Sequence, residues 1–263
     1  MQKTLDDLPQ LGRSRRRFIG RVGAASAGVG LLQLAAQAAE QVDALAKTSA
    51  PAHAVAATPQ QPPRYGMLID TQKCSSGCRA CVDGCNAEHG LDGFDAPLTD
   101  AQWIRKVELR HNSTSREVSL PVLCQHCEDP PCVDVCPTGA SFKRADGLVL
   151  VDKHICIGCR YCMMACPYKA RSFVHENLTE QVPQAPRGKG VVESCTLCVH
   201  RIDSQANPEP ACAQACREAG FSAIQFGNLN DANSPLAVRL RAEPSRELRA
   251  DLALNTGVRY QGL

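Results

Sequence analysis

Cysteine is the residue type that distinguishes this sequence, because 16 of its 263 residues are cysteines, several times the usual share. They fall into four sets of four, with none left over. The sets are Cys74, Cys78, Cys81 and Cys85; Cys124, Cys127, Cys132 and Cys136; Cys156, Cys159, Cys162 and Cys166; and Cys195, Cys198, Cys212 and Cys216. Closely spaced thiols of this kind bind metal ions and metal clusters.

The third set reproduces the bacterial ferredoxin run C-x2-C-x2-C-x3-C, with Pro167 after it. In such a run the first three thiolates wrap one [4Fe–4S] cubane, and the fourth ligates the other cubane of a pair. The second set has a similar plan and is followed by Pro137, so we expect these two sets to exchange their fourth ligands. The predicted inner ligand sets are Cys124, Cys127, Cys132 with Cys166, and Cys156, Cys159, Cys162 with Cys136.

Two other uses of cysteine fit the spacing less well. Zinc ribbons use two C-x2-C pairs and rarely a three-plus-one run. Eight disulfides would require an oxidising folding route and a different spacing. Sixteen cysteines therefore predict four [4Fe–4S] clusters and an electron carrier without catalytic residues, with a zinc-stabilised structural protein as the alternative from another class.

The first forty residues have the order of an export signal. Arg15 and Arg16 form a twin-arginine pattern, residues 22–34 are apolar and rich in Gly and Ala, and residues 36–38 offer a small-x-small cleavage site. We expect residues 1–38 to be a twin-arginine signal peptide that exports the folded, cluster-loaded protein to the periplasm. A short amphipathic anchor helix is the alternative, and whether the signal is cleaved stays open.

Charge and hydropathy set further limits. Residues 1–38 carry six basic and two acidic residues, so the rest of the chain has 23 basic and 25 acidic residues and a formal charge of −2, against +2 for the whole. This near-neutral balance argues against a nucleic-acid partner. Beyond the signal, no segment approaches the roughly 18 apolar residues of a membrane span, so we expect no transmembrane helix after signal removal.

Short aliphatic runs bounded by turn residues must position the cysteine loops. Residues 64–70 and 147–152 are predicted to be strands that lead into the first and third sets. Repetition of this strand–loop–helix unit predicts an α+β fold of two bacterial ferredoxin-like 2[4Fe–4S] modules, stabilised by clusters and rich in loops. The predicted organisation is a signal peptide (1–38), a flexible linker (39–63), an outer module in two parts (64–117 and 187–227), an inner module between them (118–186) and a C-terminal tail with short helices (228–263).

Two further elements are predicted from pattern. Residues 103–110 alternate apolar and polar side chains, which predicts a hairpin with residues 118–122. In the tail, Ser234 and Pro235 have the order of an N-cap followed by the first residue of a helix. We expect that helix either to pack on the modules or a partner, or to lie on the surface.

Five other side chains lie close to the cysteine sets in sequence. His126 and His200 are possible ligands of a Rieske-type centre. Because the cysteines suffice for every cluster, we expect both histidines to lie outside the ligand sphere or at the surface. Arg160, Lys169 and Arg171 flank the third set and could tune a cluster potential or form a docking face, with solvated surface positions as the default.

The sequence resembles the four-cluster electron-transfer subunits of complex iron–sulfur molybdoenzymes and related membrane redox complexes. The resemblance runs from about residue 64 to the C-terminus. Its most specific pieces are LPVLCQHC (120–127), PPCVDVCPTGA (130–140), CTLCVHR (195–201) and GNLND (227–231). Within this family the chain looks most like the exported iron–sulfur subunit of the Dsr membrane complex of sulfur-metabolising bacteria.

The resemblance implies ligands and partners. It pairs the outer sets as well, so that one cluster takes Cys74, Cys78, Cys81 and Cys216, and another takes Cys195, Cys198, Cys212 and Cys85. The implied partners are an integral membrane NrfD-like quinone-interacting subunit, a multihaem cytochrome c and further Dsr complex subunits, in sulfur or sulfite metabolism. The electron-transfer subunit of a polysulfide, tetrathionate or dimethyl-sulfoxide reductase of the molybdopterin type is the alternative within the class.

Three positions depart from the family pattern. The first set opens with C-x3-C, and we expect Gly77 to allow the bulge that the extra residue requires. Arg217 stands where the family often has proline after the last cysteine, and Ala232 stands where the tail motif usually has proline.

Overall fold

A computed structural model describes residues 61–263 except residues 92, 94, 97 and 111. The predicted signal peptide and nearly all of the linker lie outside the described residues. Among those described, no helix is long and apolar enough to cross a membrane.

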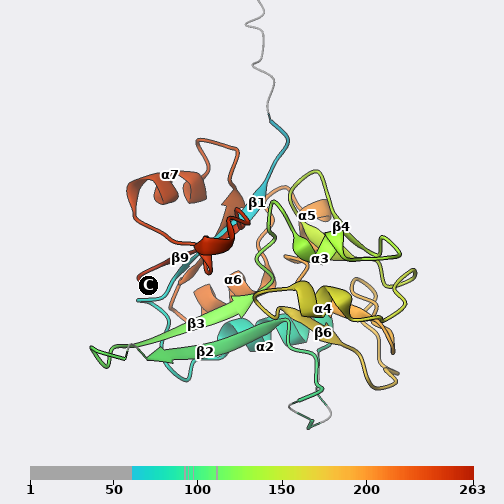
Figure 1. Cartoon of the computed structure of the whole chain (residues 1–263). Coiled ribbons are helices and arrows are strands. Elements are labelled where there is room, and N and C mark those ends of the chain that lie inside the picture. Colours follow the sequence, from blue (N-terminus) through green and yellow to red (C-terminus); the bar gives the residue numbers. More distant parts are fainter. Residues whose placement is uncertain (1–60, 92, 94, 97, 111) are drawn as a thin grey trace, which may run out of the picture. The chain divides into compact units, whose positions relative to one another are not determined.

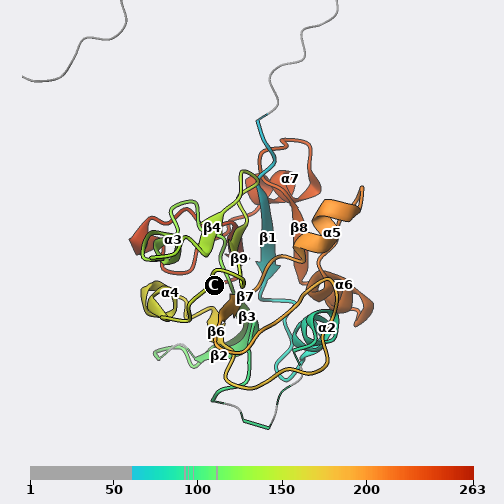
Figure 2. The same ribbon diagram turned by 90° about the vertical axis from the view of Figure 1, so that its right-hand side faces the viewer.

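A three-stranded sheet forms the centre of the chain, with strand β1 (Tyr65–Asp70) between β8 (Ile224–Asn228) and β9 (Val258–Gln261) (Figure 2). Strand β8 pairs with β1 antiparallel and β9 pairs with it parallel. The middle strand is buried on both faces, as its continuous run Met67, Leu68 and Ile69 predicts. The prediction of a strand before the first cysteine set is therefore confirmed.

Helices α2 (Ala80–His89) and α6 (Ala211–Glu218) lie side by side near this sheet (Figure 1). Their close approach depends on Gly84, because a Cβ there would lie 2.6 Å from the Cβ of Ala215. Helix α2 ends where Gly90 adopts a left-handed conformation and donates its N–H to the Asn86 carbonyl. The pair matters for the site because α2 and α6 carry four of the sixteen cysteines.

The hairpin predicted from alternation is present as β2 (Ile104–Arg110) and β3 (Glu117–Leu123), paired antiparallel. Its base is buried, since Trp103 and Ile104 are 1% and 4% exposed. Its far end leaves the core, and Leu109 is 46% exposed. Alternation therefore predicted the pairing correctly, but the apolar face is covered along only part of its length.

The cysteine loops of the second half sit between short elements. These are α3 (Pro131–Asp134), β4 (Ser141–Lys143), β5 (Val149–Val151), α4 (Tyr161–Ala165), β6 (Arg171–Phe173), β7 (Val192–Ser194) and α5 (Val199–Ser204). Strands β4 and β5 form an antiparallel hairpin, and Gly147 takes the positive φ that its turn requires. Strands β6 and β7 form a second antiparallel pair.

The C-terminal segment contains helix α7 (Pro235–Ala242), a short 3-10 turn η1 (Ala250–Leu252) and strand β9. The predicted helix start is confirmed, because the Ser234 hydroxyl accepts the Ala237 N–H at 3.1 Å. One side of α7 packs inward through Leu236, which is fully buried, while Val238 is 49% exposed. Sequence reasoning did not foresee β9.

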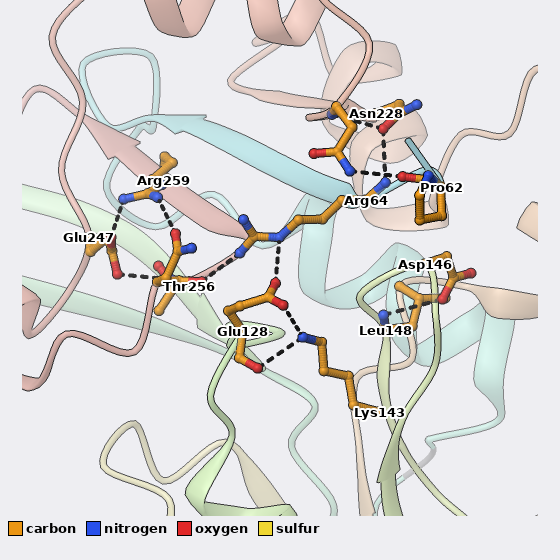
Figure 3. A network of polar contacts seen from close by, with 12 residues as sticks. Pro62, Arg64, Glu128, Lys143, Asp146, Leu148, Asn228, Glu247, Thr256 and Arg259 are labelled. Atoms are coloured by element: carbon orange, nitrogen blue, oxygen red, sulfur yellow. Dashed lines mark hydrogen bonds and ion pairs between the residues drawn. The ribbon is translucent and has the colours of Figure 1, made fainter. Parts of the chain in front are cut away.

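A polar network ties the start of β1 to the rest of the chain (Figure 3). The Arg64 side chain donates to the Asn255 carbonyl at 2.6 Å and forms an ion pair with Glu128 at 3.0 Å. Glu128 also binds the Lys143 ammonium, which donates to the Glu128 carbonyl at 2.9 Å. The network joins the C-terminal segment to the loop that follows Cys127.

Candidate iron–sulfur centres

Cysteines supply much of the buried core. One buried cluster of side chains contains eight of them with the strands of the central sheet, and a smaller cluster contains Cys132 and Cys162 with Val149 and Val192. A chain with only 4% aromatic residues therefore packs around its thiols. This is the packing expected of a small module whose core is completed by clusters.

The structure gathers the cysteines into four groups that cross the boundaries of the sequence sets. Group 1 is Cys74, Cys78, Cys81 and Cys216; group 2 is Cys124, Cys127, Cys132 and Cys166; group 3 is Cys136, Cys156, Cys159 and Cys162; and group 4 is Cys85, Cys195, Cys198 and Cys212. All four members of group 1 line one cavity, and all four members of group 3 line another.

All four cysteines of group 2 and all four of group 4 are buried. Within each group, neighbouring thiolates raise one another's pKa values. Burial raises the pKa of Cys127, and the thiolates of Cys124, Cys132 and Cys166 raise it further. In group 4, burial raises the pKa of Cys212, and Cys85 and Cys198 add to the effect. Buried thiols with raised pKa values need a cation to become thiolates, and the iron of a cluster supplies that charge.

Backbone N–H groups point at the sulfurs, as in iron–sulfur loops generally. The Sγ atom of Cys136 accepts the Ser141 N–H at 3.3 Å. In group 4, the Sγ atom of Cys198 accepts the Ala211 N–H, also at 3.3 Å. These donors stabilise thiolates and suit cubane ligands. Among the described residues, no three His, Cys, Asp or Glu side chains converge closely enough to hold a single metal ion.

Positive backbone φ angles shape the loops. Gly77 has φ of 77° in the loop of the first set, as expected for the extra residue there. Gly158, between Cys156 and Cys159, has φ of 68°, and a Cβ at this position would lie 2.1 Å from the Gly190 carbonyl oxygen. Only glycine fits there, because the backbone of the third-set loop contacts the backbone of the segment that leads into β7.

The three basic residues that flank the third set have different environments. Arg160 and Lys169 are exposed. Arg171 is only 5% exposed, so the expectation of a solvated surface position is wrong for this residue. Its Nη2 donates to Cys132 Sγ at 3.1 Å and to Ser141 Oγ at 2.7 Å.

The histidines divide in a similar way. His126 is buried, its Nδ1 accepts the Val149 N–H at 3.0 Å, and burial lowers its pKa to about 3. His200 is half-buried, and its Nε2 lies 2.7 Å from Glu88 Oε1. Sequence reasoning missed His89, which is buried with its Nε2 3.4 Å from Cys198 Sγ. Its position four residues after Cys85, on the same face of a helix, was the available signal.

Comparison with known proteins identifies the class. The family model of a 4Fe-4S dicluster domain matches residues 116–228. The "Hdr-like menaquinol oxidoreductase iron-sulfur subunit 1" of Archaeoglobus fulgidus is 38% identical, over 95% of this chain and 98% of its own. A tetrathionate reductase subunit of Salmonella typhimurium is 34% identical, over 95% and 88%, and a sulfite dehydrogenase subunit of Allochromatium vinosum is 36% identical, over 70% and 77%.

The chain therefore belongs to the family of iron–sulfur electron-transfer subunits of oxidoreductase complexes. Its cofactors are four [4Fe–4S] clusters, and its role is that of an electron carrier beside catalytic partner subunits. The predicted α+β ferredoxin-like fold class and the predicted cofactors are confirmed. The assignment of individual cysteines to individual clusters stays a prediction.

Proposed function

We propose that this chain is a periplasmic subunit that relays single electrons between a membrane quinone-interacting subunit and other redox subunits, in sulfur-compound metabolism. In this proposal each of the four cysteine groups holds one [4Fe–4S] cluster. The crossed composition of the groups supports this ligation, because each group combines three cysteines of one sequence run with one cysteine from a distant run.

The order of the groups carries the proposal, because they form a continuous row. Group 1 adjoins group 4 because Cys81 and Cys85 both lie on helix α2. Group 4 adjoins group 2, since burial raises the pKa of Cys195 and the neighbouring Cys124 adds to the effect. Group 2 adjoins group 3 through Arg171, which donates to Cys132 Sγ and lines the group 3 cavity. A row of sites in the order 1, 4, 2, 3 is the arrangement that stepwise electron transfer requires.

The two ends of the row reach the surface. Every cysteine of groups 2 and 4 is buried, whereas group 1 contains the half-buried Cys74 and Cys78. Group 3 contains Cys159, the exposed cysteine among the sixteen. Electrons can therefore enter and leave at the ends while the middle is shielded from water.

The surface beside Cys159 is suited to a partner protein. Ile157, Tyr161 and Met164 are 67%, 55% and 70% exposed there. Two basic residues of the same stretch, Arg160 and Lys169, are exposed as well. Exposed apolar side chains with basic neighbours mark a protein-interaction surface.

The names of the relatives support the proposed context. They describe subunits of a menaquinol oxidoreductase, a tetrathionate reductase and a sulfite dehydrogenase. Within the family we propose that the chain corresponds to DsrO, with an NrfD-like membrane subunit, a multihaem cytochrome c and further Dsr subunits as partners. The tetrathionate reductase relative favours a second candidate, the electron-transfer subunit of a molybdopterin reductase.

Purification together with co-expressed neighbouring gene products tests the proposal. We expect a brown complex with about sixteen iron atoms per chain, an NrfD-like subunit and haem. Reduction of the chain by a quinol should occur in the complex and not in the isolated chain. A molybdopterin subunit in the complex would support the second candidate, and low iron with stoichiometric zinc would refute both.

A further inference from the structure

Arg171 is a buried cation that faces thiols. It lies at the start of β6, is 5% exposed and donates to Cys132 Sγ at 3.1 Å. Arg171 also lines the cavity of group 3 together with Cys162. Cys132 belongs to group 2 and Cys162 to group 3, so one guanidinium touches both groups.

No carboxylate explains why this charge is buried. Among the described residues, no acidic side chain forms an ion pair with Arg171, its other hydrogen bond goes to Ser141 Oγ, and Nη1 has no partner. A buried charge needs compensation, and here the compensating charge must lie on the thiolates and on what they bind.

We propose that Arg171 sets the reduction potentials of the clusters held by groups 2 and 3. This inference rests on the ligand groups assigned under the proposed function. Reduction adds negative charge next to a fixed positive charge, so the guanidinium favours the reduced form at both sites. Because the site is buried, water screens this interaction weakly. Hydrogen bonds to cluster sulfurs act in the same direction.

The position between two groups has a specific consequence. An electron in either site repels an electron in the other, and a fixed cation beside both sites attracts the added electron at each of them. Arg171 therefore raises the potentials of the third and fourth positions of the row together. The exposed Lys169 lies in the same stretch of sequence but is surrounded by solvent, so its charge is screened.

The test compares Arg171→Gln, Arg171→Lys and the control Lys169→Gln in purified, cluster-loaded protein. EPR-monitored redox titration gives the midpoint potential of each cluster. We expect Arg171→Gln to weaken reduction of the clusters in groups 2 and 3 at least tenfold, which is a downward shift of at least about 59 mV for one electron. The clusters in groups 1 and 4 should keep their potentials.

Arg171→Lys should shift the two potentials less than Arg171→Gln, because it retains the charge, and Lys169→Gln should shift none. The proposal is overturned if Arg171→Gln leaves all four potentials within experimental error or shifts those of groups 1 and 4 equally. Loss of iron from both Arg171 variants would show that the arginine only holds the thiolates in place, and would overturn it as well. A wild-type protein without four EPR-active clusters would instead contradict the proposed function.

Discussion

Replacing Gly84 by alanine should destabilise the contact between α2 and α6. The new Cβ would lie 2.6 Å from the Ala215 Cβ and 3.2 Å from the Ala211 carbonyl oxygen. Carbon atoms normally approach to about 3.5–4.0 Å, so the helices must separate by roughly 1 Å. These helices carry Cys81, Cys85, Cys212 and Cys216, so the separation would also spread the ligands of groups 1 and 4.

The expected magnitude is a difference of two effects. Overpacking costs about 2–3 kcal/mol here, the upper part of the usual range, because neither Cβ can rotate away from the other; alanine in a helix recovers about 1 kcal/mol relative to glycine. The net loss is about 1–2 kcal/mol, which for a domain of this size lowers the apparent melting temperature by roughly 2–8 °C. Without the clash, helix propensity alone would raise the melting temperature.

The assay is loss of cluster absorbance during heating at one fixed scan rate, because cluster proteins unfold irreversibly. Gly188→Ala is the matched control, since no atom lies within 4 Å of the place where its new Cβ would stand. The double variant Gly84→Ala/Ala215→Gly should melt close to wild type, because the clash and the propensity terms both cancel. Equal or higher stability of Gly84→Ala, or no recovery in the double variant, would refute the reasoning.

Three further predictions concern ligation, acid stability and export. Cys166→Ser should alter the EPR signal of the group 2 cluster and Cys136→Ser that of group 3; the opposite result would mean that each sequence set binds its own cluster. A hydrogen bond from Arg201 lowers the pKa of Glu88 to about 2, so the stabilisation is present above the ordinary pKa of 4.5 and is lost as pH falls towards 2. Glu88→Gln should therefore lower the free energy of unfolding by about 1 kcal/mol at pH 7. The difference in melting temperature between wild type and variant should shrink below pH 4.5. A difference that does not change with pH would exclude this ion pair as its source. Replacing Arg15 and Arg16 by lysine should leave a cluster-loaded precursor in the cytoplasm, detected by cell fractionation, and normal export of that variant would contradict a twin-arginine signal.

Local signals in the sequence were sufficient for much of the fold. The spacing of the third set fixes a loop and the short helix α4, because three thiols two residues apart can only wrap a compact centre. Strands β1 and β5 and the β2–β3 hairpin were readable from short apolar runs between turn residues. The helix cap at Ser234 could also be predicted, because its hydrogen bond reaches a residue only three positions away.

Long-range contacts were not readable in this way. Nothing in the local sequence distinguishes Arg171 from Lys169, and only the packing of β6 against the cysteine loops buries one and exposes the other. His89 belongs to the site because it contacts Cys198, which lies 109 residues further along the chain. Strand β9 is four residues long, and its pairing with β1 is set by the completed fold.

The parallel pairing of β9 with β1 also bears on when the protein can mature. Met67 lies opposite Val258, so about 190 residues are synthesised after β1 before its partner strand exists, which takes roughly 10–40 s at ribosomal rates. During that time one edge of β1 is open, and the residues that close group 1 and group 4 on α6 are made only late in synthesis. Closure of the sheet and completion of groups 1 and 4 therefore come late in synthesis, and a nascent chain that lacks β9 exposes a strand edge to which other chains can pair.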